Sequence, residues 1–273
     1  ELGSLTKGDR VAIMLPNLLQ YPVVLFGILR AGLIVVNINP LYTARELEVL
    51  LKDSGAKAII ILENFARTLQ EVLPKTAIKH VISSQVGDML PAPKRWAINF
   101  AVKHVKKMVP SWHIDHALPL RDALERGART TFKPVALTHE DIAFLQYTGG
   151  TTGTAKGAML THLGVVHTLL HYAQSLGLDE NVRGCAVVPL SHVTGLVAAA
   201  FFNLELHIKL AAGKVGNDMF RIENLNIVRQ IEVRGSDDTF AFFTKCDRNF
   251  VTVFEFKDDA FDIQKNVDRK SVV

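Results

Sequence analysis

One segment rich in glycine and threonine constrains this chain more than any other feature. Residues 147–157 contain four threonines, four glycines and one lysine. Glycines allow a sharp turn that brings backbone N–H groups close to an anion, hydroxyls donate further hydrogen bonds, and lysine adds a mobile positive charge. Apolar residues 142–145 in front predict a buried strand, and residues 165–176 behind predict a helix. The order strand, loop, helix predicts a polyphosphate site; the alternative is a surface turn without a ligand.

The loop does not match the Walker-type phosphate motif. Counted from Gly150, the second glycine of that motif falls on Ala155, and Lys156 is followed by Gly157 instead of Ser or Thr. A Walker-type ATPase is therefore disfavoured.

The loop and its flanks resemble the phosphate loop of the adenylate-forming superfamily. Residues 144–147 (Phe-Leu-Gln-Tyr) before it and 158–162 (Ala-Met-Leu-Thr-His) after it are similar to bacterial long-chain fatty acid–CoA ligases in particular. The resemblance covers about residues 5–203 and includes three upstream segments, 7–17, 25–32 and 35–42. It implies a fragment of the large N-terminal domain of such an enzyme, an AMP-binding domain, over residues 1–203.

The N-terminal part of the chain alternates between strand and helix patterns. Strands are expected at 11–15, 33–36 and 58–62, with helices between them at 18–30 and 43–54. This alternation predicts an α/β fold in which helices cover a parallel sheet. Such sheets bind ligands beyond the carboxyl ends of their strands, where the 147–157 loop would lie.

Residues 204–273 resemble no segment of the superfamily and form an unassigned, β-rich tail that is either divergent or of another origin. Two phenylalanine-rich runs, 240–243 and 250–256, flank the polar residues 245–249 and predict a β-hairpin. The superfamily's acidic Mg²⁺-binding motif, ribose-binding Asp and mobile-domain lysine are not recognised in this sequence. The resemblance therefore implies a chain that does not catalyse the full reaction alone.

The resemblance implies activation of a long-chain fatty acid by ATP to an acyl-adenylate and then to acyl-CoA, with Mg²⁺ and coenzyme A. Lys156 and His192 are the expected catalytic residues. His192 follows a Pro-Leu-Ser segment like the superfamily's Pro-Leu-x-His and would line or gate the acyl pocket; otherwise it is an ordinary hydrogen-bonded histidine. The leaving pyrophosphate would be stabilised by the loop, namely by Thr148, Gly149, Gly150, Thr151, Thr152, Gly153, Thr154 and Lys156.

Two other functions stay open. One is an adenylating enzyme that makes acyl-AMP for a carrier protein or activates an aryl acid. The other is a non-catalytic nucleotide- or lipid-binding remnant.

A basic segment at 94–109 is a second candidate contact surface. Its apolar residues recur at helical spacing, and Lys103, His104, Lys106 and Lys107 lie on the other side. Such a helix either lies on an anionic membrane surface or packs on its own domain with the basic side in solvent. The net charge of +4, without basic-aromatic repeats or a zinc-finger pattern, does not indicate nucleic-acid binding.

The remaining patterns predict a cytoplasmic protein, and contact with the inner face of the membrane through 94–109 stays one of the two alternatives for that segment. Cys185 and Cys246 form no CxxC and no disulfide framework, and no signal peptide is visible. The longest apolar stretch, 21–36, is too short to span a membrane. His167 and His171 stand four residues apart but lack a third ligand, so no metal site is predicted.

Overall fold

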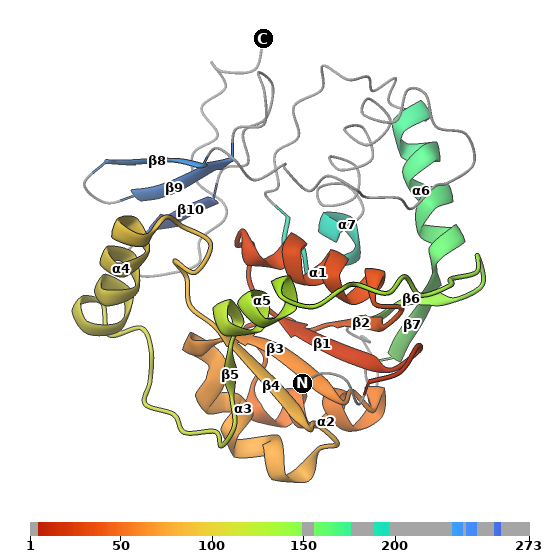
Figure 1. Cartoon of the computed structure of the whole chain (residues 1–273), viewed down its shortest axis with the longest axis horizontal. Coiled ribbons are helices and arrows are strands. Elements are labelled where there is room, and N and C mark those ends of the chain that lie inside the picture. Colours follow the sequence, from red (N-terminus) through yellow and green to blue (C-terminus); the bar gives the residue numbers. More distant parts are fainter. Residues whose placement is uncertain are drawn as a thin grey trace.

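A computed structural model describes residues 5–148, 156–175, 188–196, 231–236, 239–244 and 254–257. Its main feature is one seven-stranded sheet, in the spatial order β5-β4-β3-β1-β2-β6-β7 (Figure 1). The strands are β1 (Arg10–Met14), β2 (Ile34–Asn37), β3 (Ala58–Leu62), β4 (His80–Ser84), β5 (Leu118–Pro119), β6 (Ile142–Thr148) and β7 (Lys156–Thr161). All neighbouring strands are parallel except β6 and β7. The predicted α/β fold with a parallel sheet is therefore confirmed, apart from its antiparallel edge strand.

Helices cover both faces of the sheet, which explains why the central strands are continuously apolar. Side chains of β1 alternate between two cores: Val11 and Ile13 join one cluster, and Ala12 and Met14 join the other. The first cluster lies under α1 (Gln20–Arg30), α5 (Leu120–Ala128) and α6 (His162–Ser175). The second lies under α2 (Ala44–Ser54) and α3 (Ala66–Val72) (Figure 1). Two 3₁₀ turns flank α3, namely η1 (Glu63–Phe65) and η2 (Leu73–Lys75).

Local signals in the sequence fix the ends of α2. The Thr43 hydroxyl accepts a hydrogen bond from the Glu46 N–H, and the Glu46 carboxylate accepts one from the Thr43 N–H at 2.8 Å. This capping box satisfies backbone donors that an open helix end would leave unpaired. Gly55 ends the helix in the left-handed conformation, with φ of 60°, which a side chain disfavours.

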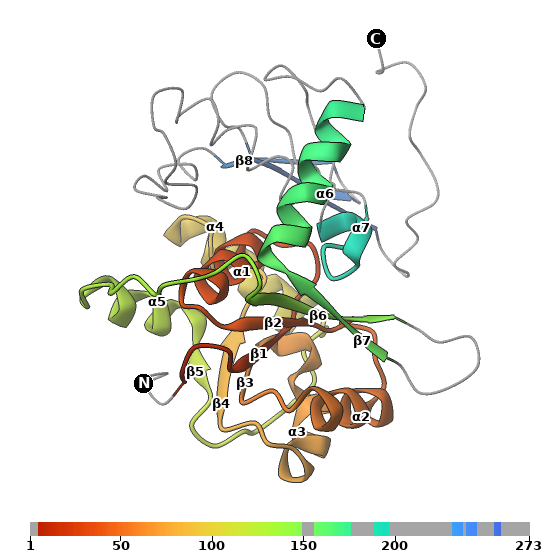
Figure 2. The same cartoon turned by 90° about the vertical axis from the view of Figure 1, so that its right-hand side faces the viewer.

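The sequence order strand, loop, helix is wrong at the glycine-rich loop. β7 follows the loop and pairs with β6 in antiparallel register, so the loop connects two strands of a hairpin (Figure 2). Helix α6 (His162–Ser175) follows β7 and lies close to its predicted range, 165–176, so the prediction missed only the intervening strand. The pattern missed this because residues 156–161 lie half-exposed on the edge strand and lack the apolar alternation that marks a buried strand.

The basic segment is helical over a shorter range than predicted. α4 (Ala92–Phe100) continues as a π-helical turn, η3 (Ala101–Val105), and ends four residues short of the expected 109. Neither element has a buried residue. Ile98, Ala101 and Val102 are nevertheless half-buried, and the Asn99 side chain bonds to Gly87 and Gln85, so both alternatives for this helix stay open.

A separate antiparallel sheet contains β8 (Ile231–Ser236), β9 (Thr239–Thr244) and β10 (Phe254–Lys257). Phe254 pairs with Phe242 and Phe256 with Phe240 across β10 and β9. The predicted pairing of the two phenylalanine-rich runs is therefore confirmed at the level of the backbone. Over the described parts of the chain, no helix is long and apolar enough to cross a membrane.

Candidate active site

The described ends of the glycine-rich loop meet at the mouth of the β6–β7 hairpin. Thr148 is the last residue of β6 and pairs with Lys156, the first residue of β7. Lys156 is exposed, as a residue that meets a soluble anion must be. The other six predicted phosphate contacts, Gly149, Gly150, Thr151, Thr152, Gly153 and Thr154, lie outside the described residues.

Tyr147 anchors the base of this hairpin to α2, on the face of the sheet that α2 and α3 cover. Its hydroxyl donates to the Asp53 carboxylate of α2 at 2.5 Å. Burial, followed by the hydrogen bond and charge of Asp53, raises the pKa of Tyr147, so the phenol keeps the proton that it donates. A Cβ on Gly157 would lie 3.0 Å from the Tyr147 ring, so a side chain at residue 157 would require the ring to shift by a few tenths of an ångström. The end of β6 that precedes the loop is therefore fixed by packing and by a hydrogen bond.

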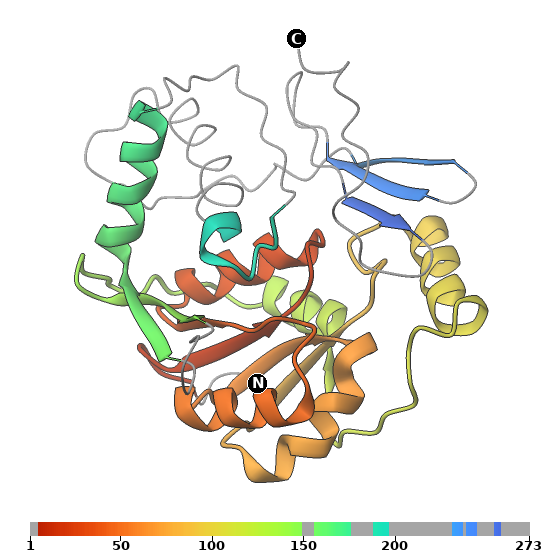
Figure 3. The same ribbon diagram turned by 180° about the vertical axis from the view of Figure 1, so that it is seen from behind.

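The turn that carries His192 lies at the carboxyl edge of the same sheet. Asn17, which follows β1, holds this turn with both ends of its amide. Its Nδ2 donates to the Val188 carbonyl at 3.0 Å, and its Oδ1 accepts from the Leu190 N–H at 2.7 Å. The His192 N–H closes the turn on the Pro189 carbonyl at 2.9 Å, and α7 (Val193–Gly195) follows. Figure 3 shows α7 beside α1, above the sheet.

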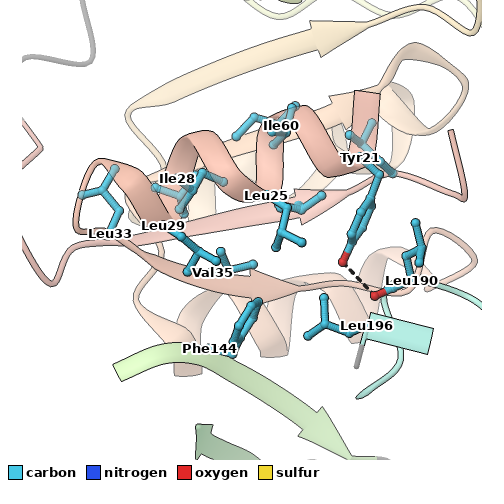
Figure 4. Close-up of a cluster of buried hydrophobic side chains, with 14 of the residues drawn as sticks. Tyr21, Leu25, Ile28, Leu29, Leu33, Val35, Ile60, Phe144, Leu190 and Leu196 are labelled. Atoms are coloured by element: carbon cyan, nitrogen blue, oxygen red, sulfur yellow. Dashed lines mark hydrogen bonds between the residues drawn. The ribbon is translucent and has the colours of Figure 1, made fainter. Parts of the chain in front are cut away.

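A chain of buried polar side chains connects this turn to β6. Gln146 Nε2 donates to the Ser191 carbonyl at 2.9 Å, and Gln146 Oε1 accepts from Asn37 Nδ2 at 3.1 Å. The Tyr21 hydroxyl lies 2.8 Å from the Leu190 carbonyl oxygen (Figure 4). The same hydroxyl lies 2.7 Å from Asn37 Oδ1. Tyr21, Asn37 and Gln146 are at most 5% exposed. Tyr21, Asn37 and Gln146 thus form a buried relay of hydrogen-bonded side chains. Buried polar groups are costly unless paired, so any arrangement of the turn that breaks the relay is disfavoured.

His192 itself is exposed on the turn that these contacts hold. Its carbonyl accepts from the Leu196 N–H at 2.8 Å, and Leu190 and Leu196 enter the apolar core under α1. Gln146 stands two residues before Thr148 on β6. The structure thus brings the turn of His192 to the strand from which the glycine-rich loop begins.

Sequence reasoning missed Asn17, Tyr21, Asn37 and Gln146 as residues that build this edge. Three of them carried a readable signal, because Asn17 follows an apolar strand, Asn37 ends one and Gln146 interrupts one. Tyr21 carried none, since an aromatic residue on the apolar side of a helix is ordinary core.

These features define a mostly parallel α/β protein with a glycine- and threonine-rich hairpin at the carboxyl edge of its sheet. The chain belongs to the AMP-binding enzyme family, whose sequence profile matches residues 2–210.

Its relatives include long-chain-fatty-acid–CoA ligases. The protein of that name from an Escherichia coli strain is 52% identical over 205 residues, which cover 74% of this chain and 36% of that protein. The one from Haemophilus influenzae is 50% identical over 209 residues, 75% of this chain and 37% of that protein. The chain thus spans about a third of the length of the curated relatives that it matches.

Solved structures support the same fold. A long-chain-fatty-acid-CoA ligase from Archaeoglobus fulgidus aligns with a TM-score of 0.57 and 25% identity, over 75% of this chain and 35% of that one. An anthranilate CoA ligase in complex with anthranoyl-AMP aligns with a TM-score of 0.61 and 22% identity, over 74% and 35% of the two chains.

Proposed function

We propose that this chain is part of a ligase that activates a long-chain fatty acid with ATP and transfers it to coenzyme A. The identity of 50–52% to long-chain-fatty-acid–CoA ligases, over about 205 residues that include the hairpin loop, carries this proposal. Residues 1–203 form the proposed portion of the AMP-binding large domain, and 204–273 form a separate tail; the family profile, which ends at residue 210, supports that boundary.

The proposed chemistry places the departing pyrophosphate at the hairpin loop. Negative charge accumulates on it as the carboxylate attacks the α-phosphorus of ATP. Preorganised N–H groups, hydroxyls and a lysine stabilise such charge where it forms. The hydroxyls of Thr148, Thr151, Thr152 and Thr154, the N–H groups of Gly149, Gly150 and Gly153, and Lys156 supply them in this proposal.

Mg²⁺ would enter this site with the phosphates of ATP, whose charge it offsets. Within the described ranges, no three His, Cys, Asp or Glu side chains form a group that could hold a metal ion. We therefore assign no Mg²⁺ ligand to those ranges.

The fatty acid would lie on the His192 side of the sheet edge. We expect His192→Ala to weaken long-chain fatty-acid binding by on the order of 1 kcal/mol, the scale of one lost hydrogen bond, while ATP affinity stays nearly unchanged. Titration of each ligand separately measures this split. His167→Ala, which removes an exposed imidazole from α6, is the matched control. Equal losses for both ligands, with lower thermal stability, would assign His192 a structural role instead.

α4 and η3 are the proposed membrane contact. Trp96, Phe100 and Val105 are between 61% and 72% exposed, and Met108, just beyond η3, is 55% exposed. Residues 89–114 contain five Lys or Arg and no Asp or Glu. Exposed apolar side chains beside a run of basic residues suit the surface of an anionic bilayer.

Reversing three of these charges (Lys103→Glu, Lys106→Glu and Lys107→Glu) should lower binding to phosphatidylserine vesicles by at least about tenfold, since each basic residue contributes ~1 kcal/mol near such a surface. Vesicle sedimentation measures the effect. Arg126→Glu, Arg129→Glu and Lys133→Glu change the net charge equally at another exposed site. Similar losses in both triple variants would indicate an effect of net charge alone.

A further inference from the structure

The buried relay from Tyr21 through Asn37 to Gln146 has a direction that its end contacts impose. Gln146 faces the Ser191 carbonyl, which can only accept, so its Nε2 must point there and its Oε1 toward Asn37. Asn37 must then turn its Nδ2 to Gln146 and its Oδ1 to Tyr21. Each amide in the relay therefore has a single orientation that satisfies its neighbours.

Tyr21 completes the relay with one hydroxyl proton. That hydroxyl lies between two acceptors, Asn37 Oδ1 at 2.7 Å and the Leu190 carbonyl at 2.8 Å. Burial raises the pKa of Tyr21, so the proton stays in place. The hydroxyl shares this one proton between its two acceptors, so the two ends of the relay lie against consecutive carbonyls, Leu190 and Ser191, directly before His192.

The relay also starts beside the phosphate side of the site. Gln146 belongs to β6 and lies two residues before Thr148, which stands at the mouth of the glycine-rich hairpin. Phe144 on the same strand is fully buried in the core that also contains Leu190 and Leu196 (Figure 4). β6 cannot shift relative to the His192 turn without breaking polar contacts between buried side chains, which is costly at a low local dielectric.

We propose that Gln146 and Tyr21 are positioning residues that hold the His192 turn in register with β6. They act through backbone carbonyls and touch no substrate. In a protein with the function proposed above, on which this inference rests, they set the spacing between the acyl side and the phosphate side of the site. Misplacement of one reacting group is costly to an enzyme that must align two substrates.

Two variants test this on the 273-residue chain. Tyr21→Phe removes only the hydroxyl, and Gln146→Met removes both polar ends of the amide while it keeps a side chain of similar length. Tyr42→Phe is the control, because it removes a half-buried hydroxyl on the other face of the sheet. Hydrogen exchange is followed for the peptide that spans 188–196, and binding of palmitate and of ATP is titrated separately.

Both relay variants should accelerate exchange in 188–196 about fivefold to tenfold, the scale of one lost hydrogen bond. Palmitate affinity should fall by a similar factor and ATP affinity by less than about twofold, with Tyr42→Phe unchanged in all three measurements. A merely structural role would lower both affinities together, and that result would overturn the inference. So would palmitate affinity that stays unchanged in both relay variants, whatever the exchange rates do.

The unmutated chain separates this inference from the function on which it rests. If it binds neither palmitate nor ATP, the proposed function fails and the inference fails with it. If it binds both ligands and the relay variants do not discriminate between them, only the inference fails.

Discussion

The 273-residue chain, given ATP, Mg²⁺ and a long-chain fatty acid, is expected to show no fatty-acid-dependent pyrophosphate exchange above background. Adenylation requires the carboxylate and the triphosphate to be held in line while a second domain closes over them. Positioning of this kind can supply roughly 7–11 kcal/mol of the barrier reduction. The chain spans about a third of the length of its curated relatives, and residues 204–273 show no recognisable ribose-binding Asp or closing lysine. We expect weak nucleotide affinity to remain and turnover to be lost.

Radiolabelled pyrophosphate exchange, with and without fatty acid, measures this directly. The intact ligase of a relative, assayed in parallel, establishes that the conditions support turnover. Robust fatty-acid-dependent exchange by the chain would contradict the expectation and would show that residues 204–273 supply the missing groups in an unrecognised form.

Gly195→Ala is expected to open the His192 turn. A Cβ at this position would clash with the Pro189 carbonyl oxygen and would lie 2.7 Å from the Val188 carbonyl oxygen. Both contacts are with backbone, and the turn cannot retreat easily because Asn17 holds Val188 and Leu190 on its other side. Overpacking of this kind typically costs about 1–3 kcal/mol. The added loss of Leu190 and Leu196 from the core places this variant at the upper end of that range.

Urea unfolding measures the change in free energy. Gly27→Ala is the matched control, because Gly27 lies inside α1 and an added Cβ would meet nothing within 4 Å. The control should be neutral or more stable by up to about 1 kcal/mol, since alanine favours helix over glycine. Equal stability of Gly195→Ala and the unmutated chain would show that the turn is not held as tightly as these contacts require.

Much of the fold could be predicted from the sequence because its signals are local. The strand at 58–62 was predicted at its observed bounds, and the helix predicted at 43–54 begins after the Thr43 cap and ends before Gly55. Buried parallel strands are uninterrupted apolar runs, and helix caps are short polar motifs; both can be read in one window of sequence.

The features that escaped prediction depend on residues far apart in the chain. β7 forms because it pairs with β6. Its residues are exposed or half-buried, and their sequence shows no alternation of apolar and polar residues that would predict a strand. The relay joins Tyr21, Asn37, Gln146 and the turn at 190–191, which no local pattern relates. In the same way, the exposure of Trp96 and Phe100 depends on how distant segments pack around α4, which helical spacing alone cannot predict.

The proposed function requires that the hairpin loop binds the phosphates of a nucleotide and that Lys156 contributes to that binding. Calorimetric titration of pyrophosphate and ATP into the unmutated chain and into Lys156→Ala measures this contribution. Lys133→Ala, which removes an exposed lysine elsewhere, controls for net charge. We predict that Lys156→Ala weakens binding of both ligands by about 1–3 kcal/mol, the scale of a charge-assisted hydrogen bond, and that the control does not. Unchanged affinity in Lys156→Ala, or no binding of either ligand by the unmutated chain, would contradict the claim.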